Sequence, residues 1–409
     1  QTQIVPNDAN RIAETGDCGI ATAQKVGNHY NFTLNHAASY ITFIPYHTQG
    51  TFSSTILMSI KVWCPDQAIC GKFNFNDNGI DLSSRPAATE DNKKIQLNLS
   101  PGGYGYKGFR IPKSATPSIN AATMVIAPGT YNKLYVQYQI IDTISTVLGT
   151  ITKEYSNVTF TAGKNKRISQ DLQVTIYPGD KYYLWDAAVG QHCWKGYEWD
   201  GPNPKQPTIP SGDASSYYPK NGDPRWYNPS GFPSAASRSC ANCPNANELR
   251  WYVRQGDIHW DFGPLWATMG HLHRGGVWIK KLSVIAAAQT PEKTVADLKQ
   301  AAPDGFNYAT TPHVLYPPVH INTPRGTPSN LNNYFFLPAL GYYHSYFRHL
   351  TGIGGMSYYW SCTPSPERNN SAYCLMIDPN DTNLDQVTRY NGVPIWSSSN
   401  EDEYRPLGM

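Results

Sequence analysis

The sequence has few charged residues. Asp, Glu, Lys and Arg make up 15% of the 409 residues, against about 25% in an average globular domain. The 33 basic and 30 acidic side chains leave a net charge of +3, and no run of Lys or Arg is longer than Lys280-Lys281. A protein that follows nucleic-acid phosphates needs a basic stripe. We therefore expect no nucleic-acid partner.

Long apolar runs are missing as well. No stretch approaches the ~18 consecutive apolar residues of a membrane-spanning helix, so we expect no transmembrane segment in this chain.

The Gly-x-Ser-x-Gly turn that presents a catalytic serine is also missing. The motifs thus predict no enzymatic activity. The chain opens with Gln1 rather than Met, which is typical of a mature or trimmed product.

Aromatic residues, by contrast, are abundant, at 13% with 28 Tyr and 11 Trp. Single hydrophobic cores stop growing near ~250 to 300 residues, so a chain of 409 residues predicts two domains. The eight cysteines are even in number in a Tyr-, Asn- and Thr-rich chain, which indicates an exported protein with disulfides. The alternative is eight reduced core residues in a reducing compartment.

The first half of the chain predicts an antiparallel β-sandwich over residues 29–178. Short alternating strands are separated there by Pro, Gly, Asn and Asp, as sandwich turns require. Residues 1–28 carry little apolar pattern, and we expect them to form an exposed arm. The expected strands are Phe32–Leu34, Tyr40–Ile44, Ile56–Trp63, Ile95–Leu99, Met124–Ile126, Leu134–Ile140, Tyr155–Phe160 and Leu172–Ile176.

Residues 179–409 predict an α+β domain. The Tyr- and Trp-rich stretch from Tyr182 to Pro233 has neither strand nor helix periodicity, and we expect a long ordered loop region. One helix should begin near Asn245 or Asn247 and end at Gly256, and a second should follow Thr290 as N-cap. Strand-like segments cover residues 334–338, 357–360, 372–377 and 393–396. The whole chain is therefore expected to be mainly β with two domains.

The ordered set of first-half segments resembles the N-terminal domain of the fimbrillins, the pilus subunits of Bacteroidetes-type fimbriae. The resemblance covers roughly residues 28 to 178. The segments that carry it are Leu34–Phe43, Met124–Tyr131, Leu134–Tyr138 with Asp142, and Ile151–Tyr155.

This resemblance implies a cell-surface fimbrial subunit of the outer membrane that binds other pilin subunits by strand complementation. A groove in the sandwich then receives a neighbour's strand through backbone hydrogen bonds and alternate apolar side chains. Family members are exported as lipoproteins and lose an N-terminal segment after a basic residue, for which Arg11 and Lys25 are the candidates. The acidic, Pro-bearing C-terminus (Asn400–Pro406) makes a poor donor strand, which favours a tip or accessory adhesin.

The second half resembles the paralogous domain of Bacteroidetes and Fibrobacter surface proteins, which is similar to the C-type-lectin and sulfatase-modifying-factor fold. The segments are Tyr183–Ala187, Cys243–Leu249, Phe336–Tyr342, and Tyr358–Pro364 with Ala372–Leu375. Cys362 stands where Ser is usual in this pattern. Cys362 and Cys374 flank a turn-rich segment, and we expect a disulfide between them.

Three further patterns are candidate binding sites. Asp378, Asn380 and Asp381 supply oxygen ligands of the kind that Ca²⁺ prefers, although a solvated acidic turn is the simpler explanation, since Asp and Asn are the usual turn residues. We expect no other cofactor. Cys240-Ala-Asn-Cys243, with His271 and His273, has the spacing of a zinc or redox site or of a small structural disulfide. Aromatic side chains of the loop region are candidates for contact with a host or bacterial surface glycan or protein: Trp194, Trp199, Trp226 and Tyr227, with Tyr197, Tyr217 and Tyr218 nearby.

Two other functions stay open at this point. A non-polymerising surface lipoprotein that binds carbohydrate would have a formed aromatic or calcium site and no removable first strand. An enzyme of the sulfatase-modifying-factor class would have reactive thiols in a cleft.

Overall fold

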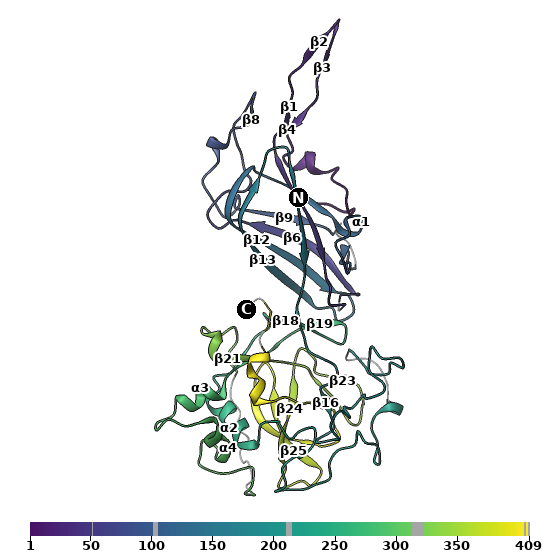
Figure 1. The fold of residues 1–409 in the computed structure, drawn as a ribbon, viewed down its shortest axis with the longest axis vertical. Helices are drawn as coiled ribbons and strands as arrows, with labels where there is room; N and C mark the ends of the chain where they lie inside the picture. Colours follow the sequence, from purple (N-terminus) through teal and green to yellow (C-terminus); the bar gives the residue numbers. More distant parts are fainter. Residues whose placement is uncertain (51, 101–104, 210–214, 313–322, 405, 408–409) are drawn as a thin grey trace. The chain divides into compact units, whose positions relative to one another are not determined.

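The computed structural model describes residues 1–50, 52–100, 105–209, 215–312, 323–404 and 406–407. The chain forms two compact units, Gln1–Gln173 and Val174–Met409 (Figure 1). In both units more residues lie in β-strands than in helices, which confirms the prediction of a mainly β chain. The second unit begins ahead of the expected boundary at 178 because β15 (Thr175–Ile176) pairs with β18 (Leu265–Thr268).

Two sheets make up most of the first unit. The larger sheet contains β10 (Phe109–Arg110), β6 (Thr55–Trp63), β12 (Gly129–Asp142) and β13 (Leu148–Phe160), with β9 (Lys94–Asn98) also paired to β6. The smaller sheet has the order β11 (Ala122–Ile126), β5 (Ser39–Tyr46) and β14 (Asn165–Asp171).

The two sheets pack face to face. Leu134, Val136 and Tyr138 alternate along β12 and are fully buried, as expected for the inward face of a strand. The Tyr138 ring meets Phe43 of β5 edge to face, with ring centroids 6.1 Å apart. The predicted sandwich is therefore present. The expectation of antiparallel pairing is wrong for one pair, since β14 runs parallel to β5.

A long hairpin extends from the first unit (Figure 1). It is formed by β1 (Gly19–Ile20) with β4 (Asn35–His36), and β2 (Gln24–Val26) with β3 (His29–Asn31). Phe32 and Leu34, expected in a sandwich strand, lie on this hairpin and are 65% and 57% exposed. The smaller elements of the unit are η1 (Ile12–Thr15), η2 (Leu82–Ser84), α1 (Pro117–Asn120), and β7 (Phe75–Asn76) paired with β8 (Gly79–Ile80).

The described residues of the second unit form five small sheets and three α-helices. In the first sheet, β18 pairs with β15 on one side and with β19 (His271–Arg274) on the other. The second contains β17 (His259–Trp260), β20 (Gly276–Lys280) and β21 (Tyr334–Pro338), and the third contains β24 (Ser357–Pro364), β25 (Ser371–Ile377) and β26 (Thr382–Thr388). In the two remaining sheets, β16 (Tyr182–Tyr183) pairs with β27 (Val393–Pro394), and β22 (Tyr342–Tyr343) pairs with β23 (Leu350–Thr351). The helices are α2 (Ala246–Gln255), α3 (Leu282–Ala287) and α4 (Val295–Gln300). The short helix η3 (Ser215–Tyr217) precedes them, and η4 (Leu331–Asn333) and η5 (Ser398–Glu403) follow them.

Helix α2 begins and ends where the sequence predicts. Asn245 is its N-cap and forms a reciprocal capping box with Glu248, and Gly256 is its C-cap. This arrangement satisfies backbone groups that a helix end otherwise leaves without partners. The predicted start of α4 is wrong, because its N-cap is Thr294, which forms a capping box with Asp297.

Asp186 organises the loop that precedes α2. Its buried carboxylate accepts hydrogen bonds from the side-chain amide of Asn228 at 2.7 Å and from the backbone N–H groups of Ser237, Arg238 and Cys240 at 3.0, 2.7 and 3.2 Å. A buried carboxylate needs such donors to replace water. Through Asp186, the Tyr183–Ala187 segment thus fixes the position of the loop that precedes α2.

No helix among the described residues is long and apolar enough to cross a membrane.

Candidate functional site

The first residues of the chain lie along the outer edge of β9. The carbonyl of Gln1 accepts from the N–H of Asn98 at 3.0 Å, and the N–H of Gln3 donates to the carbonyl of Asn98 at 2.9 Å. Thr2 forms a parallel bridge with Asn98 between these bonds, and the Gln1 amine donates to the carbonyl of Gln96 at 2.9 Å. This segment therefore acts as a short additional strand of the larger sheet.

The side chains of the same segment pair with β11 of the smaller sheet. The Gln1 amide donates to the Val125 carbonyl at 2.9 Å and accepts from the Val125 N–H at 3.0 Å. The Gln3 amide donates to the Ala121 carbonyl at 2.9 Å and accepts from the Thr123 N–H at 2.8 Å. Each glutamine amide takes the place of a backbone peptide group, since amides supply one donor and one acceptor in the same geometry.

The segment is thus a polar bridge between the two sheets. Its apolar side chains contribute little, because Ile4 and Val5 are 44% and 50% exposed. Removal of the segment would leave the backbone groups of both edges without these partners. An open strand edge is a template for another strand, and this segment covers two such edges.

The residues that follow cover the outer face of the smaller sheet. Ile12 of η1 packs against Tyr40 and Val125. The Tyr40 hydroxyl donates to Asp17, and burial together with this bond raises the pKa of Tyr40. Asp17 Oδ1 also lies 2.9 Å from Nδ1 of His36. Because these residues cover the outer face of the smaller sheet, successive side chains of β5 are buried on both faces of the strand.

The two candidate processing residues are exposed. Arg11 is the N-cap of η1, and Lys25 lies on β2 of the projecting hairpin. A cut after Arg11 would separate Gln1 and Gln3 from the rest of the unit. A cut after Lys25 would also remove β1.

Sequence reasoning missed Gln1 and Gln3. The only available signal was their spacing, since residues two apart point to the same side of an extended chain. Two polar residues at that spacing are too common to identify a site. The sequence predicts that both residues belong to an exposed arm of residues 1–28, yet Gln3 is only 5% exposed.

The aromatic residues expected to bind a ligand are largely structural. Trp194 is fully buried, and its ring meets Tyr343 edge to face at 5.1 Å; its assignment as an exposed ligand contact is wrong. Trp199, Trp226 and Tyr227 are partly buried and pack against the same core. The neighbouring Tyr218 is also buried, while Tyr197 packs on that core.

The acidic turn uses its oxygens for local hydrogen bonds. Oδ1 of Asp378 accepts from the N–H groups of Asn380 and Asp381 at 2.7 and 2.8 Å, and Oδ2 of Asp381 accepts from the Asn383 amide at 3.3 Å. Nowhere in the described residues do three or more His, Cys, Asp or Glu side chains gather closely enough to hold a metal ion.

The expected disulfide is not formed. All eight cysteines are free thiols. Cys374 lies opposite Trp360 in the β24–β25 ladder, and the register is irregular between Trp360 and Pro364. Cys362 therefore lies outside the regular pairing, its N–H bonded to the Pro244 carbonyl. Burial raises the pKa of Cys362 to about 12.

Cys240 and Cys243 also lack the environment of a reactive pair. Cys240 is fully buried, and its sulfur accepts from the N–H of Asp186 at 3.2 Å. Burial, followed by the neighbouring Cys243, raises the pKa of Cys240 well above its ordinary value. His273 packs against Trp266 with ring centroids 5.0 Å apart. A thiol held in its neutral form is a weak nucleophile and metal ligand.

Comparison with known proteins adds little. No family model matches the sequence, and no curated protein matches it. Among solved structures, a fimbrial protein from Bacteroides ovatus shows a weak similarity, with 11% sequence identity and a TM-score of 0.11 over 94% of this chain and 73% of that chain. A score this low carries no argument about fold or function.

Proposed function

We propose that this chain is a subunit of a fimbria-type surface fibre, whose first unit accepts a strand from a neighbouring subunit along β9 and β11. The observation that supports this proposal most strongly is the pairing of Gln1 and Gln3 with the edges of both sheets. A cut after Arg11 releases the segment, and a neighbour's strand then replaces its backbone bonds.

Space for apolar side chains exists beside this position. A cavity of about 260 Å³ lies on the smaller sheet, where apolar Ile12, Tyr40 and Ile44 line it together with polar residues such as Asn165 and Arg167. A donor strand with an apolar residue directed at this cavity would bury surface that the native segment leaves unfilled. Burial of apolar area stabilises by roughly 25 cal/mol per Å², which favours a strand that buries more apolar surface here than the native segment does.

The projecting hairpin supports a role in assembly. Tyr30, Phe32 and Leu34 alternate along the chain there and are 63%, 65% and 57% exposed. Exposed apolar side chains at strand spacing are typical of a surface that another protein covers. We place contact with another pilin subunit here.

The C-terminal segment is held within the second unit. The Glu401 carboxylate accepts from the hydroxyl of Tyr252 at 2.5 Å and from the N–H of Leu282 at 3.0 Å, and the Tyr404 carbonyl accepts from the N–H of Phe336 at 2.8 Å. Release of this segment as a donor strand would leave buried groups without partners. A subunit that keeps this segment in place does not donate it to a neighbour, which favours a position at the tip or in an accessory role.

The test is limited digestion with a protease specific for Arg and Lys, followed by intact mass and size-exclusion chromatography with and without candidate pilin subunits. The proposal expects a cut at Arg11 or Lys25 that converts the monomer into a partner-binding form. An Arg11→Gln, Lys25→Gln double variant should stay uncut and monomeric. Growth of long fibres from this chain alone would contradict the tip role.

A further inference from the structure

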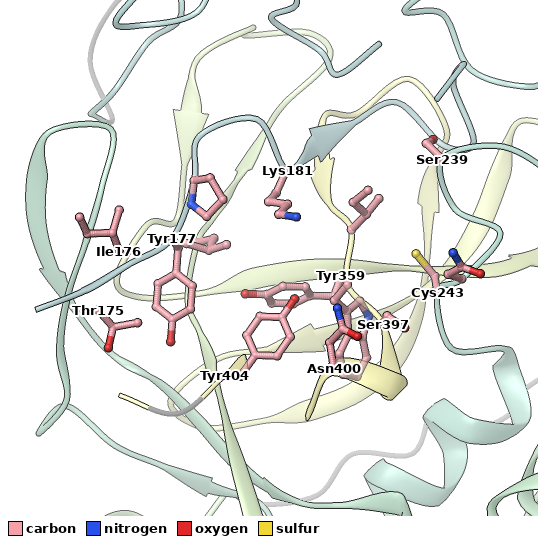
Figure 2. Close-up of a pocket in the computed structure, with 15 residues that line it drawn as sticks. Thr175, Ile176, Tyr177, Lys181, Ser239, Cys243, Tyr359, Ser397, Asn400 and Tyr404 are labelled. Carbon is pink, nitrogen blue, oxygen red and sulfur yellow. The ribbon is translucent and has the colours of Figure 1, made fainter. Parts of the chain in front are cut away.

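Two aromatic rings of the second unit are exposed where most others are packed. The packed kind lines the cavity of about 360 Å³ shown in Figure 2, where the rings of Tyr177 and Tyr404 stack with centroids 6.3 Å and planes 16° apart. Tyr346 and Phe347, by contrast, are 80% and 57% exposed, more than any other Phe, Tyr or Trp that the structure describes in the second unit. Hydrophobic burial therefore does not hold these two rings in place.

Both rings lie in the loop of residues 344–349, which joins β22 to β23. The base of this loop is fixed to the segment before β27. The N–H of Ser345 donates to Oδ1 of Asn391 at 2.9 Å, and Tyr343 exchanges two backbone hydrogen bonds with Gly392, at 2.8 and 2.9 Å. Only the tip of the loop thus depends on contacts within the loop itself.

His344 makes the contacts that hold this tip. Its Nδ1 atom accepts from the backbone N–H of Tyr346 at 3.1 Å and from that of Phe347 at 3.4 Å. Its ring also packs against the Phe347 ring, with centroids 4.9 Å apart. A ring nitrogen that accepts carries no hydrogen, so the neutral imidazole has its hydrogen on Nε2. The second proton of this imidazole is added at Nδ1, which can then accept from neither N–H.

The loop also contains a strained residue. Arg348 has a φ of 58°, in the left-handed region that residues other than Gly rarely adopt. Its N–H donates to the His344 carbonyl at 2.6 Å, and its Nε donates to the Ser345 carbonyl at 3.4 Å. Because this conformation is unfavourable by itself, the closed loop depends on its hydrogen bonds, including the two at Nδ1.

The groups around His344 disfavour its charged form in the closed loop. Burial, followed by the charge of His349, lowers the pKa of His344 below its ordinary value of 6.5. Tyr342 packs against the His344 ring at 6.0 Å, and Tyr358 of β24 packs against Tyr342 at 4.9 Å. Burial raises the pKa of both tyrosines, so both stay uncharged at neutral and mildly acidic pH. Arg348 is the other charged residue of the loop.

We propose that the loop of residues 344–349 is a pH-sensitive switch, in which neutral His344 holds Tyr346 and Phe347 at the tip and protonated His344 releases them. The closed loop binds fewer protons at His344 than the open loop does, so its stability falls as the pH falls. The stabilisation is complete above the ordinary pKa of 6.5 and is lost as the pH falls through the lower pKa of the closed loop. The switch lies within Val174–Met409 and does not depend on the strand exchange proposed for Gln1–Gln173.

The test is hydrogen exchange of the full chain at about pH 7.5 and about pH 5, on either side of the range in which His titrates. Protection is expressed relative to the intrinsic exchange rate at each pH. The amides of Tyr346 and Phe347 should lose about tenfold of their protection at the lower pH, the weight of two ordinary hydrogen bonds. The amide of Ser345 should keep its protection, because its acceptor is Asn391.

Three variants separate the accepting atom from the ring. His344→Asn supplies a side-chain oxygen that accepts from the same N–H groups and does not titrate, so protection should be equal at both pH values. His344→Phe keeps a ring beside Phe347 but has no acceptor, and protection should be low at both. His349→Asn is the matched control, since it removes the neighbouring imidazole and should leave the pH dependence in place.

Three results would overturn the proposal. The first is equal protection of the Tyr346 and Phe347 amides at both pH values in the native chain. The second is a His344→Asn variant with the pH dependence of the native chain. The third needs no variant: ¹⁵N shifts of the native, histidine-labelled protein that place the hydrogen of His344 on Nδ1 at neutral pH. None of these results affects the digestion experiment on the first unit.

Discussion

The side-chain amide of Gln1 exchanges two hydrogen bonds with the backbone of Val125, at 2.9 and 3.0 Å, as a neighbouring strand would do. The carbonyl of Gln1 at the same time accepts from Asn98 on the other sheet. One residue thus bonds to both layers of the sandwich. Because these bonds are polar and involve little buried apolar surface, we propose that the segment can be exchanged without loss of the core.

Gln3→Ala should destabilise the first unit. The substitution leaves the N–H of Thr123 without its acceptor and removes the amide that donates to the Ala121 carbonyl. Loss of partners for buried groups costs about 1 to 3 kcal/mol. Urea unfolding followed by hydrogen exchange in peptides from Gln1–Gln173 measures the change. Gln24→Ala, at an exposed position of β2, is the control, and an equal effect of the two substitutions would count against the bridge.

Asp186→Asn should destabilise the second unit by about 2 kcal/mol or more. The new amide group would face donors where the native carboxylate oxygen accepts from Asn228 and Ser237. Asn tolerates the positive φ of 51° at this position, so the backbone itself is not the cause. Thermal unfolding of the Asp186→Asn variant is compared with that of Asp200→Asn, a control substitution at an exposed position. Equal melting temperatures would refute this account of the loop.

The contribution of Asp257 should depend on pH. The Tyr334 hydroxyl donates to its carboxylate at 2.6 Å, and Lys280 and His259 lie at 3.1 and 3.3 Å. The bond from Tyr334, together with Lys280, holds the pKa of Asp257 below its ordinary value of 3.8, although partial burial works in the opposite direction. A depressed pKa stabilises the fold above the unfolded value, and this stabilisation is lost as pH falls through the folded pKa.

Asp257→Asn should therefore be less stable than the native chain at pH 7, and the difference should disappear as the pH falls below 3.8. Urea midpoints measured from pH 7 to pH 3 follow this change. A difference that stays constant over that range would show that the carboxylate charge is not involved.

Alkylation without reductant tests the cysteines. Cys64, Cys193, Cys240 and Cys374 are fully buried and should resist iodoacetamide in the native protein, because burial both blocks access and raises the pKa of each thiol. After denaturation all eight cysteines should react. Intact mass counts the labels, and six labels with a bridge between Cys362 and Cys374 would contradict the structure.

The sequence predicts those helices and strands that carry strong local signals. The capping box of Asn245 and Glu248 and the stop at Gly256 identify α2, and apolar alternation identifies β6 and β12. Strand β14 was missed because Ile168 is its one buried side chain. An edge strand with this composition has almost no hydrophobic pattern, and its pairing with β5 depends on distant residues.

Residues whose environment comes from distant parts of the chain were not predictable. Phe32 and Leu34 alternate like core residues, yet nothing local shows that no second sheet covers them. Trp194 lies in a stretch with no periodicity, although it packs against Tyr343, far away in sequence. Tyr218 likewise fills this core from an irregular segment, and its hydroxyl donates to the carbonyl of Tyr390.

Hydrogen exchange of the first unit after a cut at Arg11 tests the central claim most directly. The amides of Asn98, Thr123 and Val125 donate to the segment that the cut releases. The account predicts that these amides lose protection when the released peptide is removed and regain it when a partner pilin strand binds, while β12 stays protected throughout. Protection that does not change at these amides, or loss of protection across the whole unit, would contradict it.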